Sequence, residues 1–282
     1  IGWLYWILWI LVSSVDIITL SKILHYWEFF RQFSTFYICM FFLVLLYILN
    51  LVSVKVFGEV EYWITIIKVL TVIVFLIVGA AIIFGITNNT DAGITTFIKN
   101  GEKTSTAGLL GLFGIFSTAA FSFGGTEIVA ITAGESPNPK ETMPKAVKQV
   151  FWRILIFYIA TMFIISSIVS ADDPRLLDTN NVTASPFTIV FQNIGLGIAA
   201  VIMNIVILTS VLSAANSGMY VSSRQLFSLS LSNYGPKSFK KLNSNSTPTI
   251  ALSFSVIFMI LCFIFEKYNP KGYYMLLSMV GI

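Results

Sequence analysis

Two adjacent glycines and a carboxylate interrupt a long apolar stretch near the middle of the chain. They lie in the run Phe121-Ser122-Phe123-Gly124-Gly125-Thr126-Glu127, inside the apolar range 107–134. Each glycine costs about 1 kcal/mol of helix propensity, and a carboxylate at bilayer depth costs at least ~2.5 kcal/mol. The stretch predicts a helix that is broken at mid-membrane, with free carbonyl and N–H groups that bind a small ligand. The alternative is that the glycines pack closely against another helix.

Side chains beside this break could take part in ligand binding. Phe121 and Phe123 lie at the predicted break, just before the glycines, and an aromatic ring there can close over a ligand and attract a cation by its face. Glu127 follows the break, where the positive end of the second half-helix favours its charge. The Glu127 side chain could form a hydrogen bond with the unwound backbone, or it could accept a proton.

Two more ionisable residues lie well inside apolar stretches, Asp16 and Lys68. Such residues face a cavity or a partner by default, although each could form a structural hydrogen bond between helices. A buried aspartate is either protonated or paired with a cation. Lys22 is badly spaced for a direct contact on one helix, so a cationic ligand is an equal candidate. Lys68 either extends to the interface or carries a proton.

The composition excludes most other classes of protein. Of 282 residues, 56% are hydrophobic and only 11% are charged, against about 25% charged in soluble domains. The net charge is +4. Cys39, Cys262 and the single His25 are too few for a disulfide framework or a metal site. We expect an integral membrane protein in a lipid bilayer, not an enzyme, with no cofactor, no metal and no nucleic-acid partner.

The hydropathy pattern predicts an all-α bundle of membrane spans in a single domain, residues 1–282. The expected spans are 1–26, 36–54, 62–86, 107–134, 151–170, 194–215, 248–265 and 273–282. The chain begins and ends inside apolar stretches, so we interpret it as part of a longer protein.

The lysines and arginines favour a cytoplasmic location for the loop that follows the broken span. Alternation of the spans then places two glycosylation sequons outside, at Asn88 and Asn181.

Longer motifs along the chain are similar to those of a known family. They include the run from Ala120 to Glu135, then Asn138-Pro139-Lys140, Pro144-Lys145-Ala146, Ile67-Lys68-Val69 and Ile207-Leu208-Thr209-Ser210-Val211-Leu212-Ser213-Ala214-Ala215-Asn216-Ser217. In this order they resemble the fungal amino acid permeases of the amino acid–polyamine–organocation superfamily. The resemblance implies twelve helices with two inverted five-helix repeats, of which this chain covers the third to the early tenth. The span 107–134 is then the discontinuous sixth helix, and half of the substrate site lies elsewhere.

The resemblance also implies roles for individual residues. Carbonyl groups near Phe121, Ser122 and Gly124 would accept hydrogen bonds from the substrate ammonium. Phe121 would be an aromatic lid over the substrate. Lys68 matches a lysine proposed to serve in proton coupling. Ser210 and Asn216, on the matching eighth helix, are candidates for the pocket or gate.

The subgroup is suggested by Ser213-Ala214-Ala215-Asn216-Ser217 with Tyr220-Val221-Ser222-Ser223-Arg224, which is similar to the basic amino acid permeases. Asp16 stands where many members carry a glutamate. We expect a permease that imports amino acids, lysine and arginine above others, with protons across the plasma membrane by alternating access. The alternatives are a broad-range or neutral amino acid permease and a non-transporting amino acid sensor. The sequence does not predict the oligomeric state.

Overall fold

The helical character expected from the sequence is confirmed by the computed structural model. It describes residues 1–51, 54–85, 93–106, 138–177, 185–269 and 271–280, and the single residues 108, 116, 119 and 124. This part of the chain forms helices and the turns between them, and contains no strand. Five helical stretches in it are long and apolar enough to cross a membrane: Gly2–Leu24, Tyr62–Ile83, Lys140–Ile168, Gly197–Leu231 and Thr249–Tyr268. The described chain is an all-α, polytopic membrane protein.

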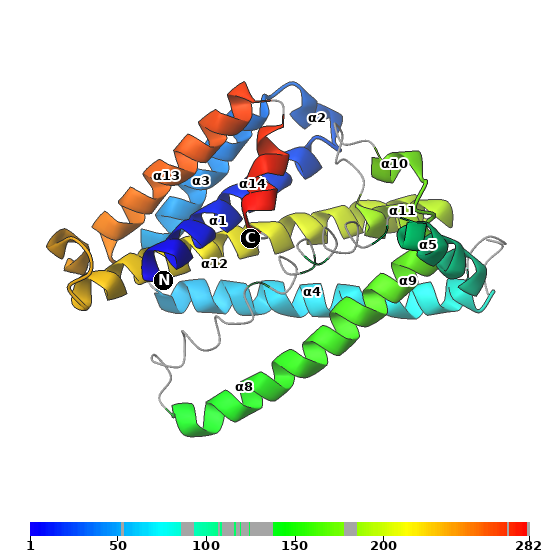
Figure 1. Ribbon diagram of the computed structural model, residues 1–282, viewed down its shortest axis with the longest axis horizontal. Coiled ribbons are helices and arrows are strands. Elements are labelled where there is room, and N and C mark those ends of the chain that lie inside the picture. The colour runs from blue at the N-terminus through cyan, green and yellow to red at the C-terminus, as the bar shows by residue number, and fades with distance from the viewer. Residues whose placement is uncertain are drawn as a thin grey trace.

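The centre of the bundle is an antiparallel pair of helices, α1 (Gly2–Leu24) and α12 (Gly197–Leu231), which lie side by side in Figure 1. At one end, the indole Nε1 of Trp3 donates to the carbonyl of Tyr234 over 3.1 Å. At the other end, apolar residues of the two helices pack together: Leu20 and Leu24 of α1 with Leu208, Val211 and Leu212 of α12. These contacts fix which residues of α1 and α12 lie at the same level.

The two helices approach closely at Gly218 of α12. A Cβ atom at Gly218 would overlap the Oγ of Ser13 and would lie 3.1 Å from Cε3 of Trp9. Small residues allow helix backbones in membranes to approach in this way. Gly218 therefore sets the distance between α1 and α12, and Ser13 of α1 lies opposite it.

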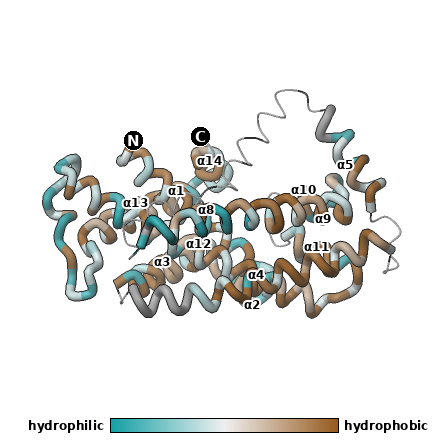
Figure 2. Tube along the Cα trace, turned by 90° about the horizontal axis from the view of Figure 1, so that it is seen from below, coloured by the Kyte–Doolittle hydropathy of each residue, from teal (hydrophilic) through white to brown (hydrophobic). Residues whose placement is uncertain are grey.

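The length of α12 exceeds what a bilayer requires. Its 35 residues span roughly 50 Å at ~1.5 Å per residue, against a hydrocarbon layer of about 30 Å. The helix therefore tilts or extends beyond the apolar layer. It leads into a hydrophilic turn with the short 3-10 helix η3 (Lys237–Lys240), which lies at the left of Figure 2.

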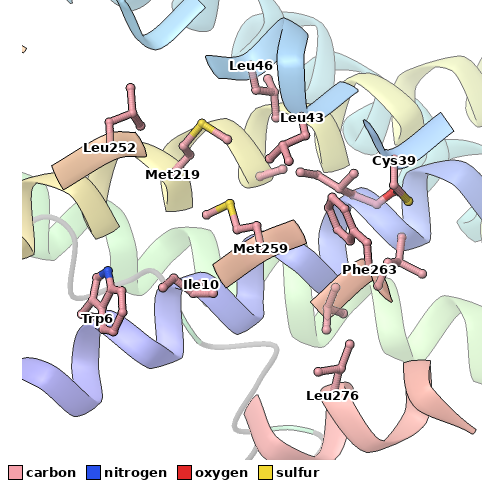
Figure 3. Close-up of a cluster of buried hydrophobic side chains, with 14 of the residues drawn as sticks. Trp6, Ile10, Cys39, Leu43, Leu46, Met219, Leu252, Met259, Phe263 and Leu276 are labelled. Atoms are coloured by element: carbon pink, nitrogen blue, oxygen red, sulfur yellow. The ribbon is translucent and has the colours of Figure 1, made fainter. Parts of the chain in front are cut away.

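One face of the central pair is covered by α3 (Thr35–Leu51), α13 (Thr249–Tyr268) and α14 (Gly272–Val280). Their buried side chains form one hydrophobic cluster with α1 and the second half of α12, as Figure 3 shows. Its labelled members are Trp6, Ile10, Cys39, Leu43, Leu46, Met219, Leu252, Met259, Phe263 and Leu276. The cluster joins helices from both ends of the chain, so it is the core of this half of the protein.

A second cluster joins α4 (Val54–Ile83), α9 (Thr161–Ile168) and α11 (Pro186–Asn193) to the first half of α12. Phe75 is fully buried, and its ring centroid lies 4.8 Å from that of Phe187. Edge-to-face packing of this kind adds about 0.5–1.5 kcal/mol beyond the buried area. Since α12 belongs to both clusters, it connects the two halves of the described chain.

The helix that ends in α9 begins much earlier in the sequence. It is continuous from α8 (Pro139–Arg153) through the π-helix η2 (Ile154–Ala160), and it runs diagonally in Figure 1. Pro139 stands at the start of α8, where its missing N–H is not needed. Pro144 lies inside the helix, within its first turns.

The segment α5 (Ile94–Thr106) carries Asn100, whose side chain bonds the end of α9. The Nδ2 of Asn100 donates to the carbonyls of Ser166 and Val169 over 2.8 and 2.9 Å, and its Oδ1 accepts from the N–H of Ala171 over 2.9 Å. Asn100 therefore satisfies backbone groups that the end of a helix leaves free.

Two short helices complete the connections, α2 (Glu28–Arg31) and α10 (Pro174–Leu177). Arg175 of α10 donates to Asn193 Oδ1 over 2.7 Å and pairs with Asp173 at 2.6 Å. The hydrogen bonds from Arg175 hold the pKa of the Asp173 carboxyl below its usual range. This network ties α10 to α11.

The observed helices differ in extent from the expected spans. The third begins at residue 54 rather than 62, the fifth at 139 rather than 151, and the sixth covers 197–231 rather than 194–215. A hydropathy reading ends a span where charged residues begin, whereas the backbone hydrogen bonds of a helix continue beyond the apolar layer. The expected discontinuous helix, 107–134, lies outside the described residues apart from isolated positions, and the inverted repeat stays a prediction.

Candidate functional site

The predicted ligand-binding residues fall into two groups. Of the run 121–127, the structure describes only Gly124, an exposed residue in a turn. Phe121, Ser122, Phe123, Gly125, Thr126 and Glu127, and the sequon residues Asn88 and Asn181, lie outside the described residues. The structure places Asp16, Lys68, Ser210 and Asn216.

Asp16 lies in the middle of α1 and is half-buried. It makes no hydrogen bond or ion pair with any residue that the structure describes. Its helix neighbours at i−4 and i+3, Val12 and Thr19, are also half-buried, while Ile17 and Ile18 are fully buried. The Asp16 carboxylate therefore points to a side of α1 that the described helices leave partly open.

The part of α12 beside Asp16 carries small side chains. Since Ser13 lies opposite Gly218 and the helices run antiparallel, Asp16 is level with the turn that contains Ala214. Ala214 is exposed, and Ser210 and Ser217 are half-buried. Spacings of four and three residues place these three on one face of α12.

We call these residues the Asp16 face: Val12, Asp16 and Thr19 of α1 with Ser210, Ala214 and Ser217 of α12. The hydroxyl of Ser210 donates to the carbonyl of Val206 over 2.7 Å, so its remaining lone pair can accept one more hydrogen bond. Chemically, the Asp16 face offers a negative charge beside small side chains. It suits a positively charged organic ligand.

Asn216 lies on a different side of α12. The Nδ2 of Asn50 on α3 donates to its Oδ1 over 2.7 Å, and both residues are buried. The carbonyl of Asn50 accepts from Thr247 Oγ1 over 3.4 Å. The structure thus brings Asp16 and Ser210 to adjacent helices, and it places Asn216 in the contact between α3 and α12.

Lys68 is half-buried in α4. Both α1 and α4 pack against α12, and in Figure 1 they lie on opposite sides of it. The structure therefore does not bring Lys68 into the Asp16 face.

Sequence reasoning missed Tyr273, at the start of α14. Its hydroxyl lies 3.0 Å from Thr19 Oγ1, one helical turn from Asp16. No sequence signal singled it out, because aromatic residues make up 15% of the chain. Tyr273 links the Asp16 face to the C-terminal end of α1.

Apolar helices around a partly open carboxylate define an all-α, polytopic membrane protein. The chain belongs to the amino acid permease family, whose sequence profile matches residues 1–282. This agrees with the resemblance found in the motifs.

Several curated relatives match the whole of this chain. The lysine-specific permease LysP of Lactococcus lactis subsp. cremoris (strain MG1363) is 40% identical over 289 residues. LysP of Escherichia coli (strain K12) is 41% identical over 285 residues. The histidine permease HisP of the same Lactococcus strain is 39% identical over 283 residues. The chain spans 56%, 58% and 59% of their respective lengths.

These names describe transport proteins rather than enzymes. All three relatives are bacterial, so the comparisons support the resemblance at the level of the family. The likeness to fungal members in particular stays a prediction.

Proposed function

We propose that the protein imports amino acids across the plasma membrane as a proton symporter and that it favours lysine and arginine. The observation that carries the proposal is the partly open carboxylate of Asp16. An unpaired charge at membrane depth is costly, and a cationic side chain of the substrate would offset that cost. The similarity to two lysine-specific permeases supports the same substrate class.

In the proposed site, the substrate bridges two parts of the protein. Its α-ammonium docks on carbonyls of the broken helix near Phe121, Ser122 and Gly124, and its side chain extends toward Asp16 and Ser210. Phe123, Gly125, Thr126 and Glu127 form the rest of this wall. We place Asn216 at the edge of the site, where its pairing with Asn50 holds α12 in position.

The transport cycle is alternating access. A substrate or a proton can shift the balance between the outward and inward states only by binding one of them more tightly. A cationic side chain meets this condition if Asp16 is accessible from one side at a time.

Competition for uptake tests the substrate class. Cells without their own lysine permease, expressing the protein in its full natural length, should accumulate labelled lysine. Unlabelled arginine should suppress this uptake, and unlabelled leucine at the same concentration should not. Suppression by leucine as well would indicate a broad-range permease. Binding without uptake, with the protein confirmed at the surface, would indicate a sensor.

The proton-coupling residue has a separate test. We propose that Lys68, or Glu127, carries the coupled proton, because a lysine inside an apolar span can change its charge state at modest cost. Lys68→Ala should make lysine uptake insensitive to external pH, whereas Lys148→Ala, on the cytoplasmic part of α8, should keep the normal profile. A normal profile in Lys68→Ala would remove Lys68 from proton coupling.

A further inference from the structure

An ammonium group already sits in an aromatic site of this structure. The Nζ of Lys22, near the end of α1, lies 3.9 Å from the centroid of the Tyr273 ring. It lies 5.8 Å from the centroid of Tyr274. Both distances are within the range of cation–π attraction, so two rings of α14 face one ammonium.

Besides the two rings, a carboxylate interacts with the Lys22 ammonium. Glu266 of α13 interacts electrostatically with Lys22. The two do not form a direct ion pair within the described residues, where the ion pairs are Lys103–Asp172 and Arg175–Asp173. We call Glu266, Tyr273 and Tyr274 the ammonium cage. Lys22, Glu266 and Tyr273 are half-buried, and Tyr274 is 38% exposed.

The cage is positioned by contacts that do not involve Lys22. The hydroxyl of Tyr273 bonds Thr19, which belongs to the Asp16 face. Glu266 lies at the end of α13, and α14 begins six residues later. The cage therefore stays assembled if the Lys22 side chain moves away.

The cage lies along α1 from the Asp16 face. Six residues separate Asp16 from Lys22, which is roughly 9 Å along a helix. The distribution of lysine and arginine predicts that this end of α1 lies outside. A ligand that approaches from outside therefore meets the cage before it meets Asp16.

We propose that the ammonium cage is an outer binding site for cationic amino acids, and that Lys22 occupies it as a competitor built into the chain. The proposal rests on the proposed function for the identity of the ligand. The side chain of a substrate lysine ends in the same ammonium as Lys22, so a cage that accepts one accepts the other. The planar guanidinium of arginine also stacks on aromatic rings.

Removal of the competitor tests the proposal. In Lys22→Met the cage is empty, so KM for lysine should fall about three- to tenfold, the factor expected for a cation–π contact at a half-buried site. Competition by leucine should not change. Lys22→Gln should behave in the same way. If KM for lysine stays the same or rises, or if neither variant reaches the membrane, Lys22 is only a structural link between α1 and α14.

A second substitution shows whether the fall in KM for lysine depends on the ammonium cage. Tyr273→Leu in the Lys22→Met background should return KM for lysine to its original value, because the ring face is gone. Tyr273→Phe in that background should keep most of the gain. Equal effects of Leu and Phe would overturn the assignment, because they would point to the Thr19 hydrogen bond instead.

The chain offers a matched control. Lys267, next to Glu266, also lies over aromatic rings, 4.8 Å from the Phe36 centroid and 5.6 Å from that of Tyr268. It is exposed and lies outside the cage. Lys267→Met should leave KM for lysine unchanged, and an equal fall in KM would show a general effect of surface charge.

A binding measurement separates this proposal from the proposed function. Lysine should raise the melting temperature of the purified full-length Lys22→Met/Asp16→Asn protein, and the effect should disappear when Tyr273→Leu is added. No stabilisation by lysine would overturn the cage. Stabilisation of this variant by lysine, when the protein with its natural Asp16 shows no uptake, would overturn transport and keep the cage.

Discussion

Asp16→Asn is expected to reduce lysine uptake about ten- to hundredfold while the protein still reaches the membrane. A hydrogen bond to a charged group contributes about 1.5–3 kcal/mol, and each 1.4 kcal/mol is about tenfold in affinity. Asparagine keeps the size of the side chain and removes only its charge. Since Asp16 makes no hydrogen bond or ion pair with any described residue, folding should lose little.

Two controls make this result specific. Asp16→Glu keeps the charge, so it should retain part of the uptake. Glu102→Gln removes an exposed carboxylate from α5 and should have no effect. Competition by leucine should become stronger relative to arginine in Asp16→Asn. Normal lysine uptake by that variant would show that the cation is recognised elsewhere, most directly in the broken helix.

The sequence alone singled out Asp16 as a candidate, and its role as a site residue stays a prediction. A carboxylate in an apolar stretch is conspicuous, because its cost must be offset by a ligand, a partner or a proton. The helices that surround it were also predictable, because apolar stretches of this length form spans. The limits of the helices differed, where the backbone continues as helix through charged residues such as Glu141. The helices α5 and α11 lie outside the expected spans.

The partners of the polar residues could not be predicted. Asn216 bonds Asn50, 166 positions away, and Tyr273 bonds Thr19, 254 positions away. Such pairs depend on how α3 and α14 are rotated against the central pair, and one sequence contains no record of that rotation. For the same reason the sequence did not predict that the Asn216 side chain meets Asn50 of α3, and its role in the pocket or gate stays a prediction.

The close approach at Gly218 predicts the largest effect on stability. Gly218→Val should lower the melting temperature of the purified protein and reduce its amount in the membrane, because the new side chain overlaps Ser13 and the rigid ring of Trp9. Extra atoms in a well-packed core cost roughly 1–3 kcal/mol and sometimes more. Gly218→Ala should have a smaller effect in the same direction, since the hydroxyl of Ser13 can rotate but the Trp9 ring cannot.

The matched control is Gly197, at the start of the same helix. A Cβ there meets nothing within 4 Å, so Gly197→Val tests a β-branched side chain on α12 without the overlap. Equal losses of stability in the two variants would mean that the helix itself resists valine and that the spacing of α1 and α12 is set elsewhere. A loss confined to Gly218→Val would establish that this contact holds Asp16 level with Ala214. In that case a valine that still permits folding should also raise KM for lysine, because it moves the two halves of the Asp16 face apart.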